Sequence, residues 1–269
     1  MRPKHRSRTV KNMRVAIVTG AAQGIGRTTA QLLGEAGYTL LLLDMQPCDA
    51  TLSALRTAGS ETEALIGDIT DEALIALAVS LVTQRWGRVD VLVNNAGISF
   101  IAPAETIEAS AFRRVLEVNL VAPFVLSRAF GSIMLAQREG SIVNVASIAG
   151  LVGVSDRSIY NASKHGLIGL TRTLAAEWGG RGVRVNAVCP GWVKTEMDIA
   201  DQASSGAYTD DDITGRIPMA RFARPDDVAH AILFLADPTQ SGFVNGHALA
   251  VDGGWIADGS WQSLRMLKR

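Results

Sequence analysis

Short, mainly apolar runs, spaced by helix-length segments, limit the folds open to this chain more than any other feature. They lie at 14–18, 40–43, 89–93, 141–145 and 183–188. A strand with one face in water alternates apolar and polar residues, whereas a continuous apolar strand is buried on both faces. Helices must then cover both sides of a parallel sheet. The sequence therefore predicts an α/β fold, a single doubly wound Rossmann domain with a mainly parallel seven-stranded sheet.

The remaining segments complete the alternation of strands and helices. Two further strands are expected at 63–67 and near 247–251. Helices are expected at about 24–37, 49–58, 71–86, 108–137, 158–178 and 225–236. Pro123 predicts a bend in the fourth of these. Residues 192–217, called the lid segment below, are less periodic and rich in small and polar residues, so no regular element is predicted there.

Polar or turn-forming residues stand where the predicted strands end. Asp44, Asp68, Asn94, Ser147 and Pro190 each fall at or just beyond such an end. In open parallel sheets, ligands bind outside the carboxyl ends of the strands. The sequence therefore predicts one functional edge.

A glycine-rich turn follows the first predicted strand and opens the first helix. Its pattern is Gly20-x-x-x-Gly24-x-Gly26. Glycines let phosphate oxygens approach backbone N–H groups, and a helix N-terminus favours negative charge. A merely structural tight turn is the alternative, but the strand–turn–helix context favours a dinucleotide pyrophosphate.

Asp44 ends the second strand, at the place where an acid binds the ribose hydroxyls of a dinucleotide. A carboxylate there repels a 2′-phosphate, which favours NAD over NADP; a solvated loop aspartate is the alternative. Arg27 lies in the first helix turn, and we expect it to face solvent. Asp68 and Ile69 either hold the adenine edge or belong to an ordinary helix N-cap, and the residues alone leave this open. Asn94–Gly97 is a polar turn expected to line the cofactor groove.

Ser147, Tyr160 and Lys164 form the predicted catalytic group. Tyrosine has a reference pKa of about 10 and is a poor base at neutral pH. Lys164 follows Tyr160 by four residues and shares its helix face, so its charge is expected to lower the pKa of the phenol. Ser147 would hold the substrate oxygen. Asn119, in the middle of a predicted helix, is expected to bend that helix or to bind a water connected to Lys164.

Taken together, these motifs resemble those of the classical short-chain dehydrogenase/reductases, over residues 14–255. The resemblance rests on the glycine turn, Asn94-Asn95-Ala96-Gly97, Asn119, Ser147, Tyr160-x-x-x-Lys164 and Pro190-Gly191 with Thr195. It implies catalysis by Asn119, Ser147, Tyr160 and Lys164. It also implies a cofactor site made of Gly20, Gln23, Gly24, Ile25, Gly26, Asp44, Asp68, Ile69, Asn95, Ala96, Gly97, Tyr160, Lys164, Pro190, Gly191, Val193 and Thr195. Members of the family are usually tetramers, paired through the helices that here span 108–137 and 158–178.

Charge and composition exclude several other classes of function. The formal net charge is zero, which argues against nucleic acid as a partner. Residues 1–12 are basic and are expected to form a flexible tail, with one domain over 13–269. No apolar run reaches the roughly 18 residues that a membrane helix needs. Cys48 and Cys189 show no metal-ligand spacing, so no metal is expected, and a reduced cytoplasm is the simplest location.

The sequence therefore predicts an NAD-dependent oxidoreductase that interconverts a secondary alcohol (a sugar, polyol or cyclic alcohol) and its ketone or lactone. An NADPH-dependent 3-oxoacyl-thioester reductase is the alternative, and a non-catalytic dinucleotide sensor is a third. We expect the substrate pocket between 98–102, 149–158 and the lid segment. Arg157 lies in the second of these, and such a residue is more often exposed than bound to an anion.

Overall fold

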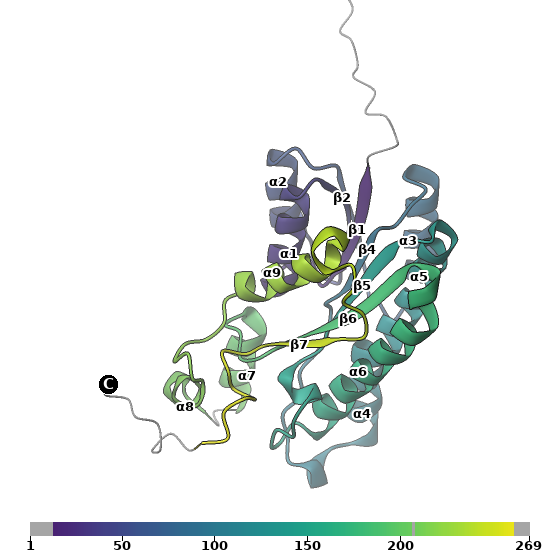
Figure 1. Ribbon diagram of the computed structural model, residues 1–269. Helices are drawn as coiled ribbons and strands as arrows, with labels where there is room; N and C mark the ends of the chain where they lie inside the picture. Colours follow the sequence, from purple (N-terminus) through teal and green to yellow (C-terminus); the bar gives the residue numbers. More distant parts are fainter. Residues whose placement is uncertain (1–12, 206–207, 261–269) are drawn as a thin grey trace, which may run out of the picture.

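The computed structural model describes residues 13–205 and 208–260. Its centre is a seven-stranded, fully parallel sheet in the order β3-β2-β1-β4-β5-β6-β7 (Figure 1). The strands are β1 (Arg14–Thr19), β2 (Tyr38–Asp44), β3 (Thr62–Ile66), β4 (Val91–Asn94), β5 (Gly140–Val145), β6 (Val183–Pro190) and β7 (Ala248–Val251). The order reverses between β1 and β4, and this switch point is where open α/β sheets bind ligands. The predicted seven-stranded α/β fold is confirmed.

Helices cover both faces of the sheet (Figure 1). The first face carries α1 (Gly24–Glu35), α2 (Asp49–Thr57) and α9 (Pro225–Ala236); the second carries α3 (Glu72–Arg85), α5 (Ala122–Gln137) and α6 (Ser158–Trp178). Successive strand residues point to opposite faces: Val18 packs with the first group and Ile17 with the second. Both are fully buried, which explains why apolar residues predominate in the strands.

The long helix predicted at 108–137 is divided. It consists of α4 (Ala109–Leu116), a π-helical segment (Glu117–Val121) and α5. Pro123, near which a bend is predicted, stands in the first turn of α5, directly after the π-helical segment, in a helical stretch that continues from Ala109 to Gln137. The helical irregularity therefore lies next to Pro123, in the segment that contains Asn119.

The lid segment is more regular than its composition suggests. It forms α7 (Glu196–Ser205) and α8 (Asp210–Arg216). Thr209 and Asp212 bond reciprocally at the start of α8 as a capping box, which explains how a short polar stretch becomes helical. Residues 206–207 lie outside the described part of the chain, as do the predicted tail, 1–12, and residues 261–269. The proposed domain limits stay a prediction.

One helical stretch among the described residues, Ala109–Gln137, is long and apolar enough to cross a membrane by length and composition. Half of its most apolar window is buried inside the fold. Leu126, Phe130 and Met134 of α5 are fully buried against the sheet, as in a core helix. The expectation that no apolar stretch is long enough for a membrane helix did not register this one, and burial against the sheet accounts for its apolar residues.

Candidate active site

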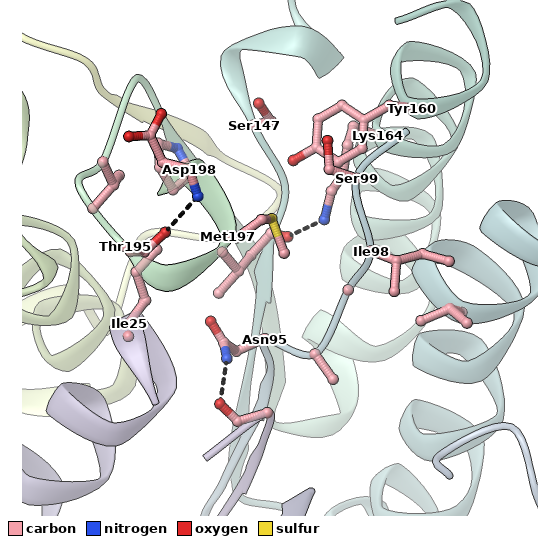
Figure 2. Close-up of a pocket in the computed structure, with 18 of the residues that line it drawn as sticks. Ile25, Asn95, Ile98, Ser99, Ser147, Tyr160, Lys164, Thr195, Met197 and Asp198 are labelled. Atoms are coloured by element: carbon pink, nitrogen blue, oxygen red, sulfur yellow. Dashed lines mark hydrogen bonds between the residues drawn. The ribbon is translucent and has the colours of Figure 1, made fainter. Parts of the chain in front are cut away.

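A cleft of about 360 Å³ opens at the carboxyl ends of the strands, within the range of volumes typical of ligand sites. Most residues of the predicted cofactor and catalytic sites line it: Gly20, Gln23, Gly24, Ile25, Asp44, Asp68, Ile69, Asn95, Ala96, Gly97, Ser147, Tyr160, Lys164, Pro190, Gly191, Val193 and Thr195. Gly26 and Asn119 are buried behind this lining. Segments far apart in the sequence thus converge on a single cavity (Figure 2).

The glycine turn has the geometry of a phosphate cradle. Gly20 and Gly24 have φ of +65° and +53°, a left-handed conformation in which glycine is favoured. A Cβ on Gly26 would lie 1.9 Å from the Gly20 carbonyl oxygen, so this position requires glycine for packing. The N-terminus of α1 faces the cleft and has no acidic residue in its first turn. A dinucleotide pyrophosphate fits such a site.

Asp44 holds the glycine turn from the end of β2. Its Oδ2 accepts a hydrogen bond from the Ala22 N–H at 2.8 Å, and its Oδ1 accepts one from Gln46 N–H at 2.9 Å. The expectation that Arg27 faces solvent is not met. The side chain is half-buried, and its Nε and Nη2 donate to the Ala22 carbonyl at 2.9 and 2.7 Å. The guanidinium of Arg27 thus binds a backbone carbonyl of the glycine turn.

Asp68 lies at the far end of the cleft and is not the N-cap of α3. Asp71 takes that role by accepting from Ala73 N–H. Asp68 accepts from the Thr70 N–H and hydroxyl and pairs with Arg114 of α4 at 2.7 Å, and these partners lower its pKa although its burial acts in the opposite direction. Arg114 also lines the cleft. Sequence reasoning missed it because nothing in a helix pattern connects it to Asp68.

Asn95 and Thr19 tie β4 to the glycine turn. The Asn95 Nδ2 donates to the carbonyls of Thr19 and Gly20, both at 3.0 Å. The Thr19 Oγ1, itself buried, accepts from the N–H groups of Asn95 and Ala96 at 3.0 Å. The Asn95 side chain is therefore committed to the loop that lines the cleft, which leaves the backbone of Ala96 and Gly97 to face it.

Tyr160 and Lys164 project from α6 toward Ser147, which follows β5 (Figure 2). The Lys164 Nζ lies 5.6 Å from the centroid of the Tyr160 ring and donates to the Val145 carbonyl at 2.8 Å. The Ser147 Oγ accepts from the Ala149 N–H at 3.1 Å, which fixes its orientation at the start of a 3₁₀ turn. The three predicted groups are brought together.

Burial dominates the protonation of this group. It raises the pKa of Tyr160 above its ordinary value, opposed by the Ser147 hydroxyl and by the positive charge of Arg157. Burial likewise lowers the pKa of Lys164 to about 8. The expectation that Lys164 lowers the pKa of Tyr160 is therefore not met in this structure. At neutral pH the tyrosine is a phenol.

Asn119 is fully buried within the π-helical segment. Its Oδ1 accepts from the Ile98 N–H and its Nδ2 donates to the Ile98 carbonyl, both at 2.9 Å, and Nδ2 also donates to the Ser163 Oγ at 3.1 Å. The side chain clamps the loop after β4 to α6. A π-helical turn inside an α-helix is common at functional sites, and here it aims the amide at that loop.

The other wall of the cleft follows β6. Val193 forms a bridge with Ala223, and the Thr195 Oγ1 accepts from the Asp198 N–H at 3.4 Å. A Cβ on Gly191 would lie 2.9 Å from the Asp252 Cα, so the chain passes close to the strand that precedes Gly253. These contacts hold the start of the lid segment against the sheet.

Arg157 is buried in the cleft, which corrects the expectation that it is exposed. Its Nη1 donates to the Ser99 Oγ at 3.0 Å and pairs with Asp201 Oδ2 at 3.2 Å. The Ser99 hydroxyl in turn donates to Asp201 at 2.8 Å. We call Ser99, Arg157 and Asp201 the distal cluster.

Two of the three acidic side chains at the start of α8, Asp210 and Asp212, have partners within the protein. Asp210 pairs with Lys194 at 2.6 Å, and Asp212 caps the helix. Within the described residues, no group of three His, Cys, Asp or Glu side chains is placed to hold a metal ion.

A family model and several known oxidoreductases match most of this chain. A family model described as enoyl-(acyl carrier protein) reductase matches residues 20–256. The chain is 42% identical over 246 residues to the cis-4-hydroxycyclohexanecarboxylate dehydrogenase of Sinomonas cyclohexanicum, covering 91% of this chain and 97% of that protein. It is 38% identical over 244 residues to the D-threitol dehydrogenase of Mycolicibacterium smegmatis, covering 90% and 92%.

A reductase and a solved structure also match. The 3-oxoacyl-(acyl carrier protein) reductase of Thermotoga maritima is 37% identical over 247 residues, covering 90% of this chain and 98% of that protein. A structure from Beutenbergia cavernae, provisionally named as an NAD(P)-dependent gluconate 5-dehydrogenase and holding NADP at low occupancy, is 44% identical with a TM-score of 0.84. It covers 91% of this chain and 97% of that chain.

Proposed function

Since the chain belongs to the classical short-chain dehydrogenase/reductase family and is thus an NAD(P)-dependent oxidoreductase, we propose that it uses NAD to interconvert a secondary alcohol and its ketone or lactone. A sugar, a polyol or a cyclic alcohol is the proposed substrate class. The observation that carries the proposal is the placement of the Tyr160 phenol beside Ser147, with Lys164 buried next to its ring.

Tyr160 is proposed as the group that moves the proton at the substrate oxygen, and Ser147 as the group that holds this oxygen. Because burial raises its pKa, the Tyr160 phenol keeps its proton at neutral pH and is present in the form that reduction of a ketone requires. Oxidation needs the phenolate, so its rate should rise as the pH rises. Lys164 would stabilise that phenolate, and Asn119 would act by fixing Ile98 and Ser163 around it.

The proposed cofactor site follows the cleft from β3 to β6. The glycine turn would hold the pyrophosphate, Asp68 and Ile69 the adenine, and Ala96 and Gly97 the path between the two ends. Lys164 and the residues after β6 (Pro190, Gly191, Val193 and Thr195) would hold the nicotinamide half. When bound, the nicotinamide supplies the hydride acceptor or donor.

Asp44 supports NAD rather than NADP. Its carboxylate lines the cleft at the end of β2 and would face a 2′-phosphate with like charge. Arg27, the cation nearest to the turn in sequence, is engaged with the Ala22 carbonyl. A solved relative holds NADP at low occupancy, so the preference for NAD over NADP in this protein needs a direct test.

A 3-oxoacyl-thioester reductase is the second candidate, and the relative of that name favours it. A thioester carried on a long arm needs an open approach to Tyr160. The distal cluster and the Trp192 ring stacked on Arg157 at 5.2 Å narrow this approach. The names of the relatives include both carboxylated and neutral alcohols, so they leave the charge of the substrate open.

The test measures absorbance of the reduced nicotinamide with a panel of polyols, sugars, cyclic alcohols and 3-oxoacyl thioesters, each with NAD(H) and NADP(H). Turnover of an alcohol with NAD, abolished in Tyr160→Phe while cofactor binding persists, is the expected result. Activity that survives Tyr160→Phe would contradict the proton role. Turnover of thioesters with NADPH alone would replace the proposal by the reductase.

We also propose a homotetramer in the cytoplasm. Val121 and Phe124 are large apolar side chains, 38% and 41% exposed, on the helical stretch that the family resemblance assigns to subunit pairing. Both cysteines are free and buried, as suits a reducing compartment. Size-exclusion chromatography with light scattering tests the oligomeric state.

A further inference from the structure

The distal cluster brings together side chains from three separate segments. Ser99 follows β4, Arg157 precedes α6 by one residue and Tyr160 by three, and Asp201 lies on α7 of the lid segment. All three line the cleft that contains Tyr160. Their bonds form a closed triangle in which each member contacts the other two. Such a triangle fixes α7 over the substrate side of the cleft.

The triangle is almost removed from water. The side chains of Arg157 and Asp201 are 11% and 19% exposed, and the Trp192 ring covers the guanidinium. A buried guanidinium requires a partner, since an unpaired buried charge is strongly destabilising. Asp201 is that partner, so the positive charge that a substrate anion would seek is already neutralised.

The charged residues next to the distal cluster also disfavour binding of an anionic substrate. Asp198, one turn before Asp201 on α7, also lines the cleft and is buried, and it pairs with Lys194 at 3.2 Å. Lys194 in turn is bound to Asp210 at 2.6 Å. A substrate carboxylate placed at Arg157 would lie close to two carboxylates, those of Asp201 and Asp198, and this repulsion between like charges is unfavourable in a partly desolvated site.

The same cluster is well suited to hydroxyl groups. Arg157 offers N–H donors, Asp201 offers acceptor oxygens, and the Ser99 hydroxyl does both. A hydroxyl also donates and accepts, so two adjacent hydroxyls can bond to the pair without separating its charges. Resting on the proposed dehydrogenase function, we infer that the Arg157–Asp201 pair selects a neutral, polyhydroxylated alcohol and excludes the corresponding carboxylate.

The experiment compares D-threitol with D-threonate, which has the same four carbons and one carboxylate. Binding of each probe to NAD-loaded protein is measured by titration calorimetry in the Tyr160→Phe background, so that no heat of reaction enters. We expect threitol to bind at least tenfold more tightly. Asp201→Asn, which keeps the shape but removes the charge, should move the ratio of the two affinities at least tenfold toward threonate.

Asp211→Asn is the matched control, because Asp211 is an exposed acid on α8 that does not line the cleft. It should leave the ratio of the threitol and threonate affinities unchanged. Thermal melting should show that the Tyr160→Phe protein and its Asp201→Asn and Asp211→Asn derivatives are all folded. Equal or tighter binding of threonate, binding of neither probe, or an unaltered ratio in Asp201→Asn would each overturn the inference. The proposed function is judged separately, by NAD-linked turnover of the alcohol panel and its loss in Tyr160→Phe.

Discussion

Lys164 should make the protein gain stability with rising pH relative to a variant that lacks this lysine. The side chain is 4% exposed, and its ammonium donates to the Val145 carbonyl. Burial lowers its pKa to about 8, against 10.5 for an ordinary lysine. In the folded protein the ammonium therefore loses its proton at a pH where the unfolded chain still holds it.

The sign and size of the effect follow from proton linkage. Below pH 8 the lysine is charged in both states, and the folded state bears the full unfavourable desolvation of the ammonium. Between pH 8 and 10.5 the unfolded state binds more protons, so the free energy of unfolding rises with pH. With these two pKa values, the rise from pH 7 to 9.5 is about 2 kcal/mol, since one pKa unit corresponds to about 1.4 kcal/mol.

The measurement is urea unfolding of the natural protein and Lys164→Met at pH 7, 8, 9 and 9.5. Burial raises the pKa of Cys48 and Cys189 to about 11, so both thiols decrease stability over this interval. The Cys48 contribution is common to both proteins and cancels. Lys164 lowers the pKa of Cys189, so both proteins carry Cys189→Ala, and the difference between the two curves then isolates the lysine. Lys194→Met is the control, because Asp210 raises the pKa of Lys194 and keeps it protonated throughout.

A difference between natural protein and Lys164→Met that stays constant from pH 7 to 9.5 would refute the reasoning. It would mean that the ammonium is solvated well enough to keep an ordinary pKa. A free energy of unfolding that falls with rising pH relative to Lys164→Met would show that the pKa of Lys164 is raised, as by a carboxylate partner. Either result would remove the physical basis for placing a desolvated cation beside the Tyr160 phenol.

Three further substitutions test the cofactor end of the cleft. Thr19→Val removes the buried acceptor of the Ala96 N–H and should lower the free energy of unfolding, measured in urea, by about 1–2 kcal/mol. An unchanged free energy of unfolding would show that this hydrogen bond does not stabilise the fold. Asp44→Ala should raise the ratio of kcat/KM for NADP to that for NAD at least tenfold; an unchanged ratio would argue against charge repulsion. Gly26→Ala places a Cβ against a backbone carbonyl and should abolish NADH binding measured by fluorescence, so intact binding would contradict the packing.

The sheet was predictable because burial on both faces leaves a clear signal in the sequence. Each predicted strand overlaps an observed one, and Val18 and Ile17 show why alternation is absent: their opposite faces both meet apolar helices. The polar strand ends were informative for the same reason. A residue such as Ser147 stands out because the strand before it is mainly apolar.

Pairings between distant segments were not predictable. Arg114 contacts Asp68 across 46 residues and Arg157 contacts Asp201 across 44, and each arginine appears in the sequence as an ordinary surface charge. The direction of the Tyr160 pKa shift escaped prediction because the spacing to Lys164 describes one charge, whereas burial of the whole site decides the balance. Desolvation is a property of the folded cavity.

The π-helical segment shows how a local sequence feature acquires a function only through the fold. A buried asparagine in a helix needs partners for three hydrogen bonds, and a regular α-helix would leave it no fixed route to Ile98. The extra residue of the π turn gives the Asn119 amide both backbone groups of Ile98 and the Ser163 hydroxyl of α6. Because Ser99 of the distal cluster follows Ile98 directly, the clamp that supports the catalytic helix also fixes the start of the substrate wall. The proposed proton transfer and the proposed substrate selection would therefore both depend on this short loop, and a change at Asn119 should disturb both together.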